Sequence, residues 1–359
     1  MVDDVLIFPP LANPFYPYLS IPTLSAYLQE NGRTVEPRDL NLELMDESFT
    51  TENIRNMEND ILAKINFLDS LPELDWKKQE EYLQLIRIKW AIENMRNSSD
   101  LTPEEVKAAL RDLNSYRYED NLPVLLEPWK YYQKFYAIYS TIISPVLVQV
   151  NDTKSVQRAI NGEEYYFFYK LLKEKYVPDI LKNKPRFVGI SITYQPQVIP
   201  ALYLGYLLKQ ADPSIFLCIG GPLFSTIGND IHNFYNDIDF VDGIVVNEGE
   251  VAINQIFDYL DGKGNIEDVI NLFHLKDGKV IENKGMFMRN INNPPLPDFS
   301  GLPLDKYFTG SLVLPYGASK GCYYNKCTFC SFPVINPIYR VKTPVDVALE
   351  IKQLSEKYN

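Results

Sequence analysis

The sequence contains few histidines, few cysteines and no long apolar stretch. Of its 359 residues, 2 are histidine and 4 are cysteine. No run of about 18 apolar residues is present, which excludes an ordinary membrane-spanning helix. The first residues, Met-Val-Asp-Asp, lack the positive charge and apolar run of a signal peptide. We therefore expect no membrane partner. Because the cysteines are clustered rather than scattered, we expect a cytoplasmic location.

The chain also lacks an excess of basic residues. It carries 35 lysines and arginines against 47 aspartates and glutamates, which gives a formal net charge of −12. That charge opposes binding to the phosphates of nucleic acids, so we expect no nucleic-acid partner. With 46% hydrophobic and 13% aromatic residues the chain is globular in composition, and its length favours two or three domains.

Three of the four cysteines, Cys322, Cys327 and Cys330, fall within nine residues. A four-iron cluster is usually held by four thiolates, so a loop that offers three leaves one iron open to a small molecule. The alternative is a zinc site, in which Cys327 and Cys330 form a C-x2-C pair and Cys322 and a fourth residue complete a tetrahedron. No second C-x2-C pair exists, and His232 and His274 lie far upstream. The pattern favours an iron–sulfur cluster over zinc or free thiols.

The residues around the cysteines extend this interpretation. Residues 311–315 have the pattern of a short buried strand, and residues 316–321 that of the loop leaving it, which would place the cysteines at the carboxyl end of a parallel strand. The phrase Lys320-Gly-Cys322, followed by Cys327-Thr-Phe-Cys330-Ser-Phe, resembles the radical S-adenosylmethionine (radical SAM) superfamily, in particular members with an N-terminal cobalamin-binding domain. One departure is that four residues, instead of the family's usual three, separate the first two cysteines.

The resemblance implies a set of cofactors and roles. Cys322, Cys327 and Cys330 would hold a [4Fe-4S] cluster, whose open iron binds the amino and carboxylate groups of S-adenosylmethionine, with Phe329 beside the adenine. An electron donor would reduce the cluster. In the family the reduced cluster cleaves S-adenosylmethionine to a deoxyadenosyl radical, which attacks an unreactive carbon, and cobalamin delivers a methyl group or assists a rearrangement.

Two parts of the chain alternate between buried strands and helices. The first predicts a strand at residues 5–8, a helix from Ser20, its cap, to the stop at Gly32, and a strand at 34–40. The second predicts strands at 186–192, 215–219 and 243–246, with helices at 198–210 and 250–260. We therefore predict an α/β fold: a Rossmann-like, doubly wound parallel sheet with a large helical insertion. The resemblance implies that the sheet is of the B12-binding type and that the start of a radical SAM (β/α) barrel follows it.

Residues 46–184 interrupt the sheet pattern with a helical one. Helices are predicted at 53–67 and 76–95, and a third begins at Thr102, which has capping-box spacing to Glu105. Two further helical segments, 128–143 and 163–181, are rich in aromatic residues. We interpret their stripes as helix-packing core in preference to a substrate or partner surface.

Small and polar residues stand at the carboxyl end of each predicted strand. These ends meet at one edge of a parallel sheet, where such folds bind ligands. The Pro-Pro after the first strand, Gly220-Gly-Pro222 and Asn247-Glu-Gly-Glu250 resemble the cobalamin-binding domain that precedes many radical SAM domains. The Asp-x-His-x-x-Gly motif is absent, so cobalamin would bind without a lower histidine ligand. The predicted cofactor contacts are Pro10, Asn41, Ser191, Thr193, Gly220, Gly221, Asn247, Glu248 and Gly249.

We predict four parts in the chain. Residues 1–45 and 185–285 form the cobalamin-binding-type domain, 46–184 the insertion, 286–307 a proline-rich linker, and 308–359 the N-terminal portion of the radical SAM domain. A hairpin is expected at 272–281, turning at Asp277-Gly278, and a helix at 344–357. A full barrel takes about 250 residues, whereas 29 follow Cys330. We expect either a fragment or a chain completed by a partner, without efficient turnover alone.

Two functions compete on this reading. The first is a cobalamin-dependent radical SAM enzyme, or its N-terminal part, which acts on a small-molecule or peptide substrate, for example by methyl transfer. The second is a noncatalytic Rossmann-like binding module whose cysteine loop binds zinc or is vestigial.

Overall fold

The computed structural model describes residues 4–98, 100–112, 134–135, 153–162, 168–235, 238–288, 291 and 294–358. This part of the chain is built on a seven-stranded sheet in the order β2-β1-β3-β4-β5-β6-β7. The first five strands are parallel, and β6 and β7 continue the sheet in antiparallel fashion. The strands of this sheet are β1 (Asp4–Phe8), β2 (Val35–Asp39), β3 (Phe187–Ser191), β4 (Phe216–Gly220), β5 (Gly243–Val245), β6 (Leu272–Lys276) and β7 (Lys279–Glu282).

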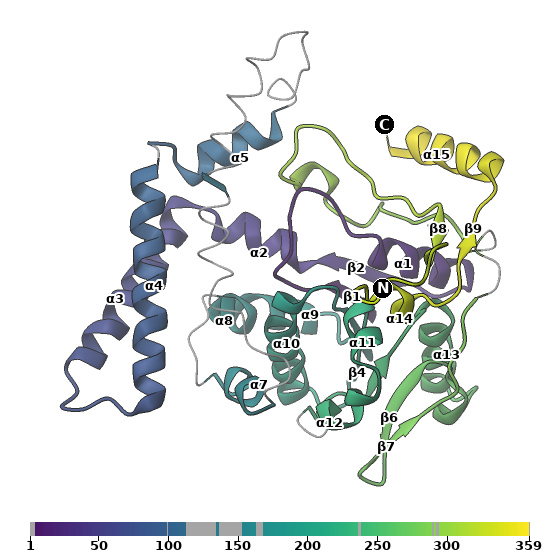
Figure 1. Ribbon diagram of the computed structural model, residues 1–359, viewed down its shortest axis with the longest axis horizontal. Helices are drawn as coiled ribbons and strands as arrows, with labels where there is room; N and C mark the ends of the chain where they lie inside the picture. Colours follow the sequence, from purple (N-terminus) through teal and green to yellow (C-terminus); the bar gives the residue numbers. More distant parts are fainter. Residues whose placement is uncertain are drawn as a thin grey trace.

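Helices cover both faces of the sheet (Figure 1), which explains why the central strands β1, β3 and β5 are buried along their whole length. The α-helices of the described residues are α1 (Ser20–Glu30), α2 (Leu40–Ser48), α3 (Thr51–Asp69), α4 (Trp76–Ser98), α5 (Pro103–Arg111), α7 (Thr153–Ile160), α8 (Phe168–Leu171), α9 (Val177–Leu181), α10 (Val198–Ala211), α11 (Pro222–Ile227), α12 (Ile231–Tyr235), α13 (Glu250–Leu260), α14 (Phe332–Ile335) and α15 (Pro344–Tyr358).

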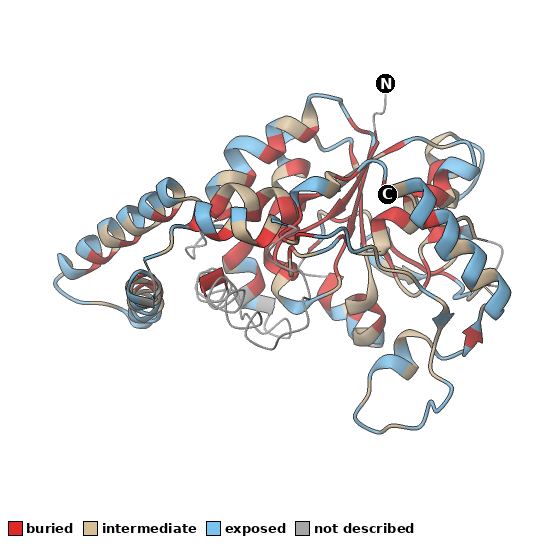
Figure 2. Ribbon diagram, turned by 90° about the horizontal axis from the view of Figure 1, so that it is seen from above, coloured by how far each residue is buried: buried red, intermediate tan, exposed pale blue. Residues whose placement is uncertain are grey.

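The alternation of side chains along β1 separates two hydrophobic clusters. Leu6 and Phe8 pack with α1 and α13 on one face, whereas Val5 and Ile7 pack with α2, α9 and α10 on the other. Figure 2 shows the buried residues concentrated on the strands and on the helix faces that touch them. The core is therefore a three-layer arrangement with the sheet in the middle.

The predicted α/β pattern is confirmed with boundaries that differ by one or two residues. The strands β1 to β5 and the helices α1, α10 and α13 form where the sequence predicts them, and β1 pairs with β2 in parallel. The predicted hairpin turns at Asp277-Gly278 and joins the main sheet beside β5. The assignment of Ser20 as a cap is wrong: α1 begins there, but no side chain caps it, and the Ser20 hydroxyl is buried without a hydrogen-bond partner in the described part.

The predicted helical segment 46–184 contributes no strand among its described residues. α3 and α4 pack as a helical hairpin that projects from the sheet (Figure 1). The predicted capping box is confirmed at the start of α5, where Thr102 and Glu105 exchange side-chain to backbone hydrogen bonds. The predicted segment 128–143 falls outside the described residues except for Lys134 and Phe135. The other aromatic segment is helical from Phe168 onward, with a π-helical turn at Leu172–Tyr176. The limits of the domains stay a prediction.

The predicted strand at 311–315 is wrong. Residues 312–317 have no regular structure, and Leu312 and Val313 are exposed. A buried strand needs neighbours that satisfy its backbone groups, and within the described ranges no strand pairs with this segment. Instead, β8 (Ser319–Lys320) and β9 (Arg340–Val341) form a separate antiparallel pair. The helix predicted at 344–357 is confirmed as α15. No described helix combines the length and the apolar character needed to cross a bilayer.

Candidate functional site

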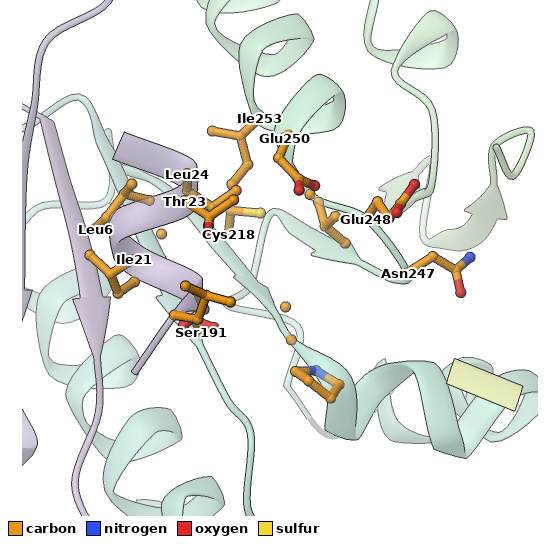
Figure 3. A pocket seen from close by; sticks show the side chains of 18 of the residues that line it. Leu6, Ile21, Thr23, Leu24, Ser191, Cys218, Asn247, Glu248, Glu250 and Ile253 are labelled. Atoms are coloured by element: carbon orange, nitrogen blue, oxygen red, sulfur yellow. The ribbon is translucent and has the colours of Figure 1, made fainter. Parts of the chain in front are cut away.

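A pocket of about 340 Å³ opens at the carboxyl edge of the parallel strands. Figure 3 shows it from close by, with side chains from the strand ends and from α1 and α13 pointing into it. Six of the predicted cofactor contacts line this pocket: Ser191, Gly220, Gly221, Asn247, Glu248 and Gly249. The strand-end argument therefore brought together residues that are up to 58 positions apart in the sequence, from 191 to 249.

The inner wall of the pocket is apolar. Leu6, Ile21 and Leu24 line it from β1 and α1, and Ile253 from α13. Cys218 also lines it from β4 and is buried. Burial, assisted by the nearby carboxylate of Asp242, raises the pKa of the Cys218 thiol to about 12. A thiol that stays neutral is a poor metal ligand, so this cysteine is a lining group.

The two glycines at the end of β4 are required by the backbone itself. A Cβ on Gly221 would lie 2.3 Å from the carbonyl oxygen of Ile192, and the residue has φ +109°. A Cβ on Gly220 would lie 2.9 Å from the carbonyl oxygen of Val245. Both were predicted as cofactor contacts, but close approach of the neighbouring backbone already requires glycine at these positions.

Gly249 differs from those two glycines. A Cβ there would make ordinary contacts, at 3.5 Å from Leu24 and 3.7 Å from Ile253, and both neighbours line the pocket. A larger side chain at position 249 would therefore enter the pocket without strain in the backbone. Among the three glycines, Gly249 is therefore the one at which a substitution can reduce the volume of the pocket.

Three predicted contacts lie outside the lining of this pocket: Pro10, Asn41 and Thr193. The amide N–H of Thr193 donates to Oε1 of Gln197 at 2.9 Å, and Nε2 of Gln197 donates to the carbonyl of Pro9 at 2.6 Å. Oδ1 of Asn41 accepts from the amide of Ala12 at 2.7 Å. Asn41 and Thr193 thus take part in hydrogen bonds that hold the loops after β1 and β3.

Four charged side chains form a cluster at the rim of the pocket, which we call the rim cluster: Glu248, Glu250, Lys320 and Arg340. Oε1 of Glu248 accepts from Nη1 of Arg340 at 2.7 Å and from Nζ of Lys320 at 3.1 Å. Oε1 of Glu250 accepts from the same Nζ at 3.0 Å. Burial disfavours the charge of Lys320, but Glu250 and Glu248 outweigh it and raise the pKa of the ammonium group. The two glutamates therefore favour the charged form of Lys320.

The three clustered cysteines lie in residues 321–339, which we call the cysteine loop; β8 and β9 form its neck. All three are free and partly exposed. Among the described residues no three His, Cys, Asp or Glu side chains are close enough together to hold a metal ion. Phe329, the predicted adenine neighbour, is 91% exposed. Three thiols in a short loop are the donor set of an iron–sulfur cluster, but the loop is not arranged around one here.

A buried carboxyl joins the linker to the sheet near this edge. Oδ2 of Asp39, at the end of β2, accepts from the hydroxyl of Tyr307 at 2.7 Å, and Oδ1 accepts from the amide of Leu42 at 2.9 Å. Burial raises the pKa of Asp39 from 3.8 to about 6. The first residue after the linker is also bound to the loop after β1, because the amide of Phe308 donates to the carbonyl of Pro14.

Sequence reasoning missed the C-terminal side of the pocket. Lys320 from the neck, and Ile335 and Asn336 at the end of α14, line it together with the sheet edge. Lys320 was noted as part of the motif before the first cysteine, but nothing in that motif indicates its partners. Contacts between segments about 70 to 90 residues apart leave no local pattern, so the sequence holds no signal for them.

Comparison with known proteins supports the assignment of the fold. No family model matches the chain. An uncharacterized methyltransferase of Pyrococcus horikoshii is 28% identical over 156 residues, which is 42% of this chain and 32% of that protein. The 4'-phospho-dehydrooxetanocin synthase of Priestia megaterium is 22% identical over 184 residues, 50% of this chain and 24% of that protein.

A solved structure shares the fold. The cobalamin-dependent S-adenosylmethionine radical enzyme OxsB, with aqua-cobalamin and S-adenosylmethionine bound, superposes with a TM-score of 0.52 at 13% identity. The match covers 98% of this chain and 31% of OxsB. The chain thus spans between 24% and 32% of the length of these three proteins. What is common to both is a mostly parallel α/β fold of the kind found in cobalamin-dependent radical SAM enzymes.

Proposed function

We propose that this chain is the cofactor-binding part of a cobalamin-dependent radical SAM enzyme that functionalises an unreactive carbon by methyl transfer or related chemistry. One observation carries the proposal: an apolar pocket at the carboxyl edge of a parallel sheet is walled on its far side by the loop with three clustered cysteines. The likeness of the fold to OxsB and the sequence match to a methyltransferase support it.

The pocket suits part of a cobalamin. Its volume of about 340 Å³ lies at the low end for small-molecule sites, so one apolar, flat portion would enter it while the rest covers the sheet edge. Backbone groups near Gly220 and Gly221 and the hydroxyl of Ser191 would contact that portion. Neither His232 nor His274 lines the pocket, so the chain would bind cobalamin without a histidine on cobalt.

Cys322, Cys327 and Cys330 would hold a [4Fe-4S] cluster with one iron left for S-adenosylmethionine. Bound in this way, the cluster and S-adenosylmethionine supply radical chemistry at carbon. The residues of this chain bind and orient the cofactors: the apolar wall excludes water, and the rim cluster fixes the neck of the cysteine loop. We extend the proposal to a small-molecule or peptide substrate and to an electron donor for the cluster.

The first experiment is an anaerobic titration with hydroxocobalamin, followed by visible spectra. The wild-type chain should give a saturable, stoichiometric spectrum. Gly249→Leu should weaken binding about 5-fold to 150-fold, because filling a packed site costs about 1–3 kcal/mol. Gly264→Leu is the matched control, since this exposed glycine also has room for a Cβ but lies outside the pocket. Absence of binding by the wild-type chain, or equal binding by both variants, would contradict the proposal.

The second experiment is reconstitution with iron and sulfide. The wild-type chain should turn brown and retain about four irons per chain. Replacing Cys322, Cys327 or Cys330 by Ser should reduce that incorporation, and Cys218→Ala should not. Stoichiometric binding of zinc without uptake of iron and sulfide would favour the alternative, a binding module with a zinc-holding loop.

A further inference from the structure

The neck of the cysteine loop is not stable by its own contacts. β8 and β9 contribute two residues each, and their register places Lys320 opposite Arg340. A two-stranded ribbon of this size is marginal in water, and like charges directly opposite each other destabilise a strand pair. Another part of the chain must therefore hold the neck closed.

Glu248 provides that contact. One oxygen, Oε1, accepts from both cations of the neck, at 2.7 Å from Arg340 and 3.1 Å from Lys320. The other oxygen, Oε2, accepts from the amide of Met288 at 2.5 Å. Both carboxylate oxygens are thus engaged, and they join the end of β5, the linker and both strands of the neck.

Because Glu248 and Arg340 are both buried, the charge of each depends strongly on the presence of the other. The side chains of Glu248 and Arg340 are 7% and 5% exposed, and Glu248 is the only carboxylate paired with Arg340 among the described residues. Lys320 is less dependent, because Glu250 also pairs with it at 3.0 Å. Without the charge of Glu248, the buried guanidinium of Arg340 would have no carboxylate partner. This costs far more free energy than the loss of an exposed ion pair.

The same carboxylate belongs to the pocket. Glu248, Glu250 and Lys320 line the pocket on one side, and Ile335 and Asn336, at the far end of the cysteine loop, line it on another. Figure 3 shows the carboxylates of Glu248 and Glu250 side by side at one end of the pocket. Release of the neck would therefore remove part of the pocket wall.

We propose that Glu248 is a positioning residue: by neutralising Lys320 and Arg340 together, it holds the cysteine loop against the pocket at the sheet edge. The inference rests on the proposed function only in assuming that the cysteine loop carries the iron–sulfur cluster. The clamp itself is a property of the chain without cofactors. In the enzyme it would fix the distance between a ligand in the pocket and the three cysteines.

The test is hydrogen–deuterium exchange of the cofactor-free chain, read at the neck and at α14. Glu248→Gln should speed exchange there at least about tenfold and leave the amides of β1, β3 and β4 unchanged. Asp261→Asn is the matched control, because it removes a carboxylate that binds two arginines at the opposite edge. It should leave the neck and α14 at wild-type rates.

A rescue separates positioning from general loss of stability. The double variant Glu248→Gln, Arg340→Met has no unpaired guanidinium in the neck. Its exchange rates at α14 should therefore return to within about threefold of wild type. The clamp is refuted if Glu248→Gln leaves the neck protected, if it speeds exchange equally across the sheet, or if the second substitution makes the loop still more open. A loop released by Glu248→Gln in a chain that fails to bind hydroxocobalamin would refute the proposed function and leave the clamp intact.

Discussion

The two edges of the main sheet each carry a cluster of paired acidic and basic side chains, and the clusters differ in burial and in what they join. At the amino edge, Arg33 pairs with Asp258 and Asp261, and Arg186 pairs with Asp261 and Asp4. This cluster joins the ends of α1 and α13 to the starts of β1 and β3. At the carboxyl edge, the rim cluster joins the sheet to the linker and to the neck of the cysteine loop.

Burial determines what each cluster contributes. Arg186 is 49% exposed, so water screens its pairs, and the more buried pair of Arg33 with Asp261 still has side chains that are 16% and 17% exposed. Glu248 and Arg340 are 7% and 5% exposed, so their pairing is strong only while it is complete. The amino edge thus stabilises one domain by small increments, whereas the carboxyl edge specifies where a separate loop lies. Three predictions test this difference.

The largest effect on the free energy of unfolding is expected from a substitution of glycine, and each edge of the sheet has a glycine with positive φ to compare. Gly221→Ala at the carboxyl edge should lower the free energy of unfolding by about 3 kcal/mol or more, because the new Cβ would meet the carbonyl of Ile192 at positive φ. Gly262→Ala at the amino edge also has positive φ, +70°, but nothing lies within 4 Å of its Cβ. It should cost about 1 kcal/mol. Urea unfolding of both variants measures the difference, and equal losses would refute the account of Gly221.

The second prediction concerns pH at the carboxyl edge. Burial raises the pKa of Asp39 from 3.8 to about 6, so the folded chain holds this proton more tightly than the unfolded chain. The free energy of unfolding should therefore fall as pH rises from about 4 to about 6, and stay level above. The shift of about two pH units is worth at most about 3 kcal/mol. Asp39→Asn should remove this part of the pH dependence in denaturation curves.

A second variant checks the cause. The Tyr307 hydroxyl favours the ionised form of Asp39, so Tyr307→Phe should move the transition to higher pH. An unchanged slope in Asp39→Asn would show that another group is responsible.

The smallest effect is expected at the amino edge. Hydrogen bonds from Arg33 and Arg186 hold the pKa of Asp261 below its usual value. Its contribution is therefore present at neutral pH and lost as the pH falls below about 4. Asp261→Asn should cost no more than about 1 kcal/mol at pH 7, since the pairs are partly exposed. This difference from wild type should vanish in acid. If Asp261→Asn instead lowers the free energy of unfolding by several kcal/mol at pH 7, the two edges do not differ as described.

Local patterns predicted the sheet well. The segments that became β1, α1 and β2 carry their own signals, namely buried runs, a proline in the first helical turn and Gly32 after the helix. The parallel topology alone then predicted that the carboxyl ends of the strands meet at one edge, and Ser191, Gly220 and Asn247 do line one pocket there. These predictions succeeded because each depends on neighbours in sequence or on the regular geometry of parallel strands.

Long-range contacts were not predictable. The apolar run at 311–315 resembles a strand, but no strand of the described residues pairs with it, and Leu312 and Val313 stay exposed. Glu248 was predicted to contact a cofactor, which stays a prediction, while the structure engages its carboxylate with Arg340, Lys320 and Met288. Those partners follow it by 40 to 92 positions, and no periodicity encodes such pairings.

The most direct test of the contrast is hydrogen–deuterium exchange at both edges, with and without saturating hydroxocobalamin. The account predicts protection at residues 247–250 and at α14, with no change at residues 258–263 of the amino edge. Protection at the amino edge, or no protection at the carboxyl edge despite stoichiometric binding, would contradict the claim that the pocket beside the cysteine loop is the cofactor site.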